Sequence, residues 1–128
     1  MATPVIVTAP LPAALLARAA RCWRRARDSH APAQQRLYAL LAPLGYGMMA
    51  PVIDSVMTLG EVCLGRQLFG CCALSRDGDE ALLCALLADP ARLDRLPHCR
   101  FCPDRRWRER RELFAGALRS ARVMAALA

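Results

Sequence analysis

The sequence predicts an all-α fold, a small single-domain bundle of about five helices. Hydrophobic residues make up 55% of the 128 residues, which is enough for one modest core. Much of this apolar content is Ala and Leu, and aromatic residues are only 5%, which favours helices over strands. Apolar residues also recur three and four positions apart, and no segment alternates strongly enough to predict a sheet. We expect residues 1–10 to be a flexible or extended N-terminal segment.

The first helix is predicted over Leu11–Asp28. Leu15, Ala19 and Cys22 mark an apolar stripe along it, which is typical of a helix that packs on a core. The opposite face carries arginines and is expected to face solvent: Arg18, Arg21, Arg24 and Arg25.

The second and third helices are predicted over Gln34–Leu41 and Pro51–Leu64. Pro32 suits the start of the second, because proline is favoured at a first helical position. The third is apolar on two adjacent stripes, so we expect it to be the most buried helix. Its narrow polar strip contains Asp54 and Glu61, which we expect to be solvated or to lie at an interface.

The fourth and fifth helices are predicted over Asp77–Ala88 and Pro103–Leu127. Asp77 can cap the fourth helix, with Glu80 three residues later at the capping-box spacing. A short helical turn is predicted between the two helices, over Ala91–Pro97.

Cysteine and histidine residues gather on two segments beside the fourth helix, and they are the candidate metal ligands: Cys71, Cys72, His98, Cys99 and Cys102. Cys99 and Cys102 have the spacing of one zinc-binding pair, and His98 could replace either. The adjacent Cys71 and Cys72 are a poor second pair, because successive side chains of an extended chain point apart. Zinc is the candidate cofactor, and an iron–sulfur cluster is the less favoured one.

Two other interpretations of these cysteines stay open. Cys102 precedes Pro103 at a predicted helix start, where the helix dipole lowers a thiol pKa, so a redox dithiol is conceivable. Alternatively, the cysteines pack as small apolar residues where two loops meet. A metal site requires the two segments to meet, and residues 91–97 must then fold back along the fourth helix. The remaining cysteines are expected in the core: Cys22, Cys63 and Cys84.

The formal net charge is +7, and every basic residue is an arginine. Such a charge favours a nucleic acid, an anionic membrane or an acidic protein as partner. The two Arg-rich helices are predicted to form one basic surface for an acidic protein or nucleic acid, with these contact residues: Arg18, Arg21, Arg25, Arg105, Arg108 and Arg111. A helix-turn-helix is disfavoured, because the third helix is apolar where a recognition helix is polar.

No catalytic motif is recognisable, so we expect a protein that is not an enzyme. The weakly charged stretch Leu37–Gly60 is interrupted by prolines and glycines, so no membrane span is expected. The N-terminus lacks a basic segment and contains Pro4, Pro10 and Pro12, which makes it a poor signal peptide. A cytoplasmic location with mostly free thiols follows.

The sequence therefore predicts a small cytoplasmic regulatory or protein-interaction module, which a Cys/His metal site could staple. An Arg-rich regulator that binds nucleic acid is the first alternative, and a thiol or metal sensor is the second. A protein partner is favoured, and the sequence does not predict the oligomeric state.

Overall fold

The computed structural model describes residues 12–70, 73–95 and 104–127, which form α-helices and short 3₁₀ helices. The α-helices are α1 (Ala13–Asp28), α2 (Ala33–Leu41), α3 (Ala50–Leu64), α4 (Ala73–Ala88) and α5 (Asp104–Leu127). The 3₁₀ helices are η1 (Ala42–Leu44), η2 (Gly47–Met49) and η3 (Pro90–Arg95). No strand occurs in the described residues, and the prediction of an all-α bundle is confirmed. Residues 1–10 lie outside the described part.

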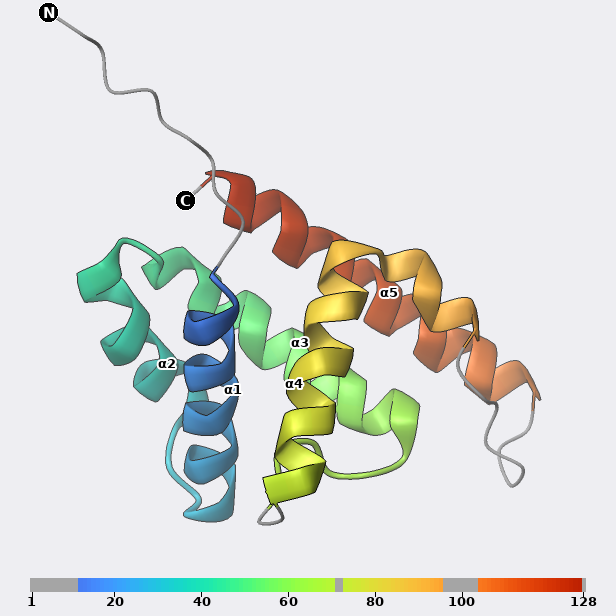
Figure 1. Ribbon diagram of the computed structural model, residues 1–128, viewed down its shortest axis with the longest axis horizontal. Helices are drawn as coiled ribbons and strands as arrows, with labels where there is room; N and C mark the ends of the chain where they lie inside the picture. The colour runs from blue at the N-terminus through green and yellow to red at the C-terminus, as the bar shows by residue number, and fades with distance from the viewer. Residues whose placement is uncertain (1–11, 71–72, 96–103, 128) are drawn as a thin grey trace, which may run out of the picture.

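The helix α3 runs through the middle of the molecule (Figure 1). The pair α1 and α2 packs against α3, as α5 does, and α4 lies between α1 and α5 in this view. The most extensive packing is between α3 and α5. The largest fully buried side chains come from all five α-helices and include Trp23, Leu37, Met57, Leu86 and Phe114.

The prediction that the third helix is the most buried is wrong. The helix α1 buries eight of its 16 residues, whereas α3 buries six of its 15. Four of the buried residues of α1 are alanines, and their small side chains let neighbouring elements approach on more than one side. The larger apolar side chains are more numerous in α3 than in α1, but Val62 on the outer face of α3 stays exposed.

One stretch of the described residues, Gly47–Leu64, is long and apolar enough to cross a membrane by length and composition. Its mean hydropathy is 1.3, and 39% of it is buried in the fold. A core helix of a water-soluble bundle meets the same criterion, so this stretch alone is weak evidence for a membrane span.

The start of α4 differs from the prediction. The helix begins at Ala73, four residues before the predicted first residue Asp77, and Gly78 lies within it. Asp79, in the second turn of this helix, is only 3% exposed. Its carboxylate accepts hydrogen bonds from the Phe69 backbone N–H at 2.9 Å and from the Arg66 guanidinium at 2.8 Å. This acidic residue therefore anchors the preceding turn.

The turn after α3 is held from both of its flanking helices. Gly65 ends α3 with a φ of 68°, a left-handed conformation that glycine adopts without strain. The Leu68 N–H donates to Glu61 Oε2 at 2.8 Å, as the Phe69 N–H does to Asp79. Phe69 itself has a φ of 58° and is buried, so a bulky residue occupies a strained conformation. These two carboxylates supply the contacts that hold it there.

The polar strip of α3 faces α1 and the start of α2 inside the molecule. The Trp23 indole N–H donates to Asp54 Oδ1 at 2.7 Å, and the Gln34 amide donates to Asp54 Oδ2 at 3.0 Å. Arg24 donates to Asp28 and forms an ion pair with Glu61. The strip is therefore an internal interface, the second of the two predicted alternatives.

The burial of Arg24 corrects the prediction that it faces solvent, because its side chain is only 9% exposed. Two carboxylates compensate its charge, as a buried guanidinium requires.

Candidate functional site

The candidate metal ligands lie outside the described residues: Cys71, Cys72, His98, Cys99 and Cys102. The zinc, iron–sulfur and dithiol hypotheses therefore stay predictions. Elemental analysis of protein purified without a metal-binding tag tests them. Within the described part of the chain, no group of three or more His, Cys, Asp and Glu side chains could hold a metal ion.

The described residues that flank the two cysteine-bearing segments lie apart. In Figure 1, α4 begins beside the lower end of α1, whereas η3 runs along α5 and away from that point. The contacts of η3 are with α5 and with α4, which it directly follows. Residues 90–95 therefore do not return along α4, which is the path that the metal hypothesis requires.

The three described cysteines are free thiols. Cys63 is buried, as predicted, whereas Cys22 and Cys84 are half-buried. Burial raises the pKa of the Cys63 thiol, although the charges of Arg111 and Arg110 act in the opposite direction. Burial also raises the pKa of Cys84, and the nearby carboxylate of Glu80 adds to this effect. A raised pKa keeps these two thiols protonated, so they are poor nucleophiles near neutral pH.

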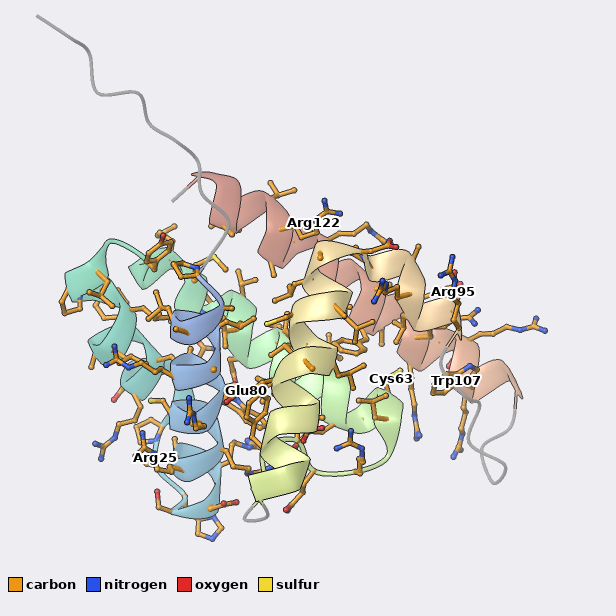
Figure 2. The ribbon with its side chains drawn as sticks, viewed as in Figure 1. Arg25, Cys63, Glu80, Arg95, Trp107 and Arg122 are labelled. Atoms are coloured by element: carbon orange, nitrogen blue, oxygen red, sulfur yellow. The ribbon has the colours of Figure 1, made fainter. Side chains whose placement is uncertain are left out.

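The most promising described site is an arginine face on α1, which consists of Arg18, Arg21 and Arg25. All three are exposed, and their spacing of three, four and seven residues places them on one side of the helix. Figure 2 shows Arg25 on the outer side of α1. The apolar stripe that buries Leu16 and Trp23 dictates this arrangement, because the other side of an amphipathic helix must face solvent.

The arginine face surrounds an open hollow of about 570 Å³. Its apolar lining is supplied by Cys22 of α1, Leu40 of α2 and Phe69 of the turn after α3. Cys22 and Leu40 are half-buried and so remain reachable, whereas Phe69 is 2% exposed. The hollow therefore combines a basic rim with a small apolar floor.

The arginines of this hollow differ in whether they form ion pairs within the molecule. Arg21 lies 3.4 Å from Glu80 of α4, an exposed pair that bridges two helices (Figure 2 labels Glu80 between them). Arg24 is compensated by Asp28 and Glu61. The side chains of Arg18 and Arg25 make no ion pair or hydrogen bond with the described residues, so their charges are available to a ligand.

The predicted contact residues of the fifth helix lie elsewhere. Arg108 is exposed on α5, and Arg111 is half-buried 3.3 Å from Asp94 of η3. The side chain of Arg105 is not among those described. In Figure 1 the start of α5 and the helix α1 lie on opposite sides of the molecule with α4 between them. The described arginines of the two helices therefore do not form one basic surface, contrary to the prediction.

The arginines of this site could be grouped from the sequence, whereas its apolar floor could not. Helical spacing alone groups Arg18, Arg21 and Arg25. Leu40 and Phe69 reach the hollow only through the packing of α2 and of the turn against α1, and no local pattern marks them.

Comparisons with models of protein families, with curated proteins and with solved structures find no match.

Proposed function

We propose that the protein is a small regulatory module that binds an acidic protein segment across the arginine face of α1. The observation that carries this proposal is the pair Arg18 and Arg25, exposed and without an ion-pair partner in the described chain, at the rim of a hollow with an apolar floor. Seven residues of helix separate the two guanidinium-bearing positions by about 10 Å along the axis. Carboxylates two turns apart on a partner helix have the same spacing, so a helical acidic segment fits the rim.

The floor of the hollow favours a protein over a nucleic acid. Proteins that hold single-stranded nucleic acids stack bases on exposed aromatic rings, and the ring in this hollow, Phe69, is buried. In contrast, a protein segment that has an apolar side chain between two carboxylates can pack that side chain on Cys22 and Leu40.

The two kinds of contact have different roles in this proposal. An exposed ion pair contributes about 0.2–1 kcal/mol and is screened by salt. The arginines therefore mainly steer and orient the partner, and the apolar contact supplies the rest of the affinity.

The test uses a synthetic amphipathic peptide with Glu and Leu at helical spacing, and it compares the affinities of three double variants. Replacement of Arg18 and Arg25 by Gln is expected to weaken binding about tenfold, since two exposed ion pairs are lost. The matched control replaces Arg36 and Arg119 by Gln. Both arginines are exposed and lie outside the hollow, so this variant loses the same amount of positive charge. A third variant replaces Arg106 and Arg108 on α5.

Fluorescence anisotropy with the peptide, a DNA duplex and a single-stranded RNA separates the outcomes. Equal losses in the α1 variant and the control would show that only net charge matters and would refute the proposal. Tight, steeply salt-dependent binding of DNA or RNA, with no peptide binding, would establish the nucleic-acid alternative instead.

A further inference from the structure

The four longest helices, α1, α3, α4 and α5, line an apolar cavity of about 150 Å³. Its walls include Leu16 of α1, Ile53 and Met57 of α3, Leu83 of α4 and Ala121 of α5. All five of these side chains are buried. The cavity therefore reaches into the core, and it opens to solvent on one side.

The cavity exists because small side chains occupy positions where the helices converge. Ala121 and Ala125 lie one turn apart on α5, and both are buried, yet neither fills the space in front of it. Ala13 has the same role at the start of α1. A well-packed core leaves few voids larger than a water molecule, so a space of this size in a small domain requires an explanation.

The opening of the cavity is marked by the lining residues that keep some exposure: Ala13, Cys84, Leu87 and Arg122. Among the described residues that line the cavity, Arg122 is the one charged residue, and none carries a carboxylate. Arg122 also borders a neighbouring hollow with Asp89 and Glu112, but it forms no ion pair with any described residue. Figure 2 shows Arg122 on α5 where this helix passes the end of α4.

The volume and the charge together define a ligand class. A cavity of about 150 Å³ lined mainly by aliphatic side chains accepts an apolar molecule of about six carbon atoms. A cation at the opening of such a space favours an anionic group at one end of that molecule. The chemistry is that of a short aliphatic chain with a terminal carboxylate.

We propose that the cavity is a binding site for a free short-chain aliphatic carboxylate. The hydrocarbon chain lies among Ile53, Met57 and Leu83, and the carboxylate stays at the opening beside Arg122. This site is separate from the arginine face of α1, so binding of a small ligand here does not depend on the proposed protein partner.

Hexanoate and hexan-1-ol are the probes, and the methyl group of Ile53 is the reporter. The sequence contains two isoleucines, Ile6 and Ile53, so a carbon-labelled isoleucine methyl spectrum of the full chain assigns the response directly. Both probes are expected to shift the Ile53 resonance saturably. The change Arg122→Gln should weaken hexanoate binding about threefold to fivefold and leave hexanol binding unchanged. The matched control Arg119→Gln, exposed one turn earlier on α5, should affect neither.

A cavity-filling variant provides the second arm of the test. The change Ala125→Leu should abolish the response of Ile53 to both probes, while circular dichroism checks that the helices remain and peptide binding at the arginine face is unchanged. No saturable Ile53 shift in the parent protein would overturn the proposal. It would also be overturned if a folded Ala125→Leu variant still bound hexanoate, or if Arg122→Gln behaved like Arg119→Gln.

Discussion

The two sides of α3 contact the rest of the molecule through different chemistry. Toward α1 and the turn that follows α3, its residues Asp54 and Glu61 accept hydrogen bonds from the Trp23 indole, the Arg24 guanidinium and the Leu68 backbone N–H. Toward α5, it presents apolar side chains and a glycine, and the cavity lies between this apolar side and the helices α1, α4 and α5.

The two sides therefore differ in what stabilises them: the α1 side depends on directional contacts, and the α5 side depends on how well side chains fill the space. Hydrogen bonds and ion pairs are directional, so the α1 side has one preferred arrangement and depends on each partner being present. Apolar contacts are not directional, so the α5 side depends on how well the side chains fill the space. Substitutions should therefore damage the two sides in different ways.

The largest effect is expected for a charge placed on the apolar side. The change Val56→Asp puts an unpaired carboxylate into the core and should lower the free energy of unfolding by more than about 4 kcal/mol. The control Val62→Asp lies on the same helix but is 46% exposed, so its effect should be below about 1 kcal/mol. Urea unfolding monitored by circular dichroism compares them, and similar losses would contradict the burial of Val56.

A smaller effect is expected when one partner of the buried ion pair is removed. The change Glu61→Leu leaves Arg24 with Asp28 alone and the Leu68 N–H without its acceptor, so the loss should be about 2–4 kcal/mol.

The double variant Arg24→Leu with Glu61→Leu tests whether this loss comes from the stranded charge. It should be less destabilised than the sum of the two single variants, because no unpaired buried charge remains. Strict additivity in the same unfolding experiment would show that the pair does not couple the two helices.

Substitutions at two glycines test how tightly the side chains pack on the α5 side. A Cβ at Gly60 would lie 3.1 Å from Phe114 Cζ and 3.2 Å from Leu68 Cδ1, both in buried side chains. The change Gly60→Ala should therefore destabilise by about 1–2 kcal/mol despite the better helix propensity of alanine. Gly116 on α5 has open space, its nearest contact being an arginine nitrogen at 4.0 Å, so Gly116→Ala should stabilise by up to about 1 kcal/mol. Thermal unfolding should show shifts of opposite sign.

The smallest effect is a dependence of stability on alkaline pH. Burial raises the pKa of Cys63 above its ordinary value of 9.0, so the unfolded thiol ionises before the folded one. Its contribution to stability is complete below that ordinary value and is lost as the pH rises toward the folded pKa. The change Cys63→Ala should make the decline in unfolding free energy between about pH 8 and pH 10 shallower. An unchanged slope would mean that the thiol is not desolvated.

Most of the fold could be predicted from the sequence, because amphipathic spacing is a local signal. The spacing of Leu15, Ala19 and Trp23 fixes the inner face of α1 without any knowledge of its neighbours. The start of α4 could not be predicted in the same way. Asp77 and Glu80 match a cap pattern, whereas Asp79 between them serves the turn after α3.

The site shows the same limit. Arg18, Arg21 and Arg25 could be grouped by spacing, but Arg24 could not be separated from them, because its partner Glu61 comes 37 residues later. The cavity had no sequence signal at all. Ala121 and Ala125 resemble any other alanines of a helix until α1, α3 and α4 are placed around them.

The turn after α3 restricts how the length of this chain can vary. Surface connections usually tolerate insertions, because their backbone groups are free to bond with water. Here the backbone N–H groups of Leu68 and Phe69 each donate a hydrogen bond to a carboxylate, and the two carboxylates lie on different helices. One extra residue after Gly65 would displace both by about 3.8 Å, beyond hydrogen-bonding reach. The number of residues in this turn is therefore determined by these two contacts, and an inserted tag or fusion here would break both of them.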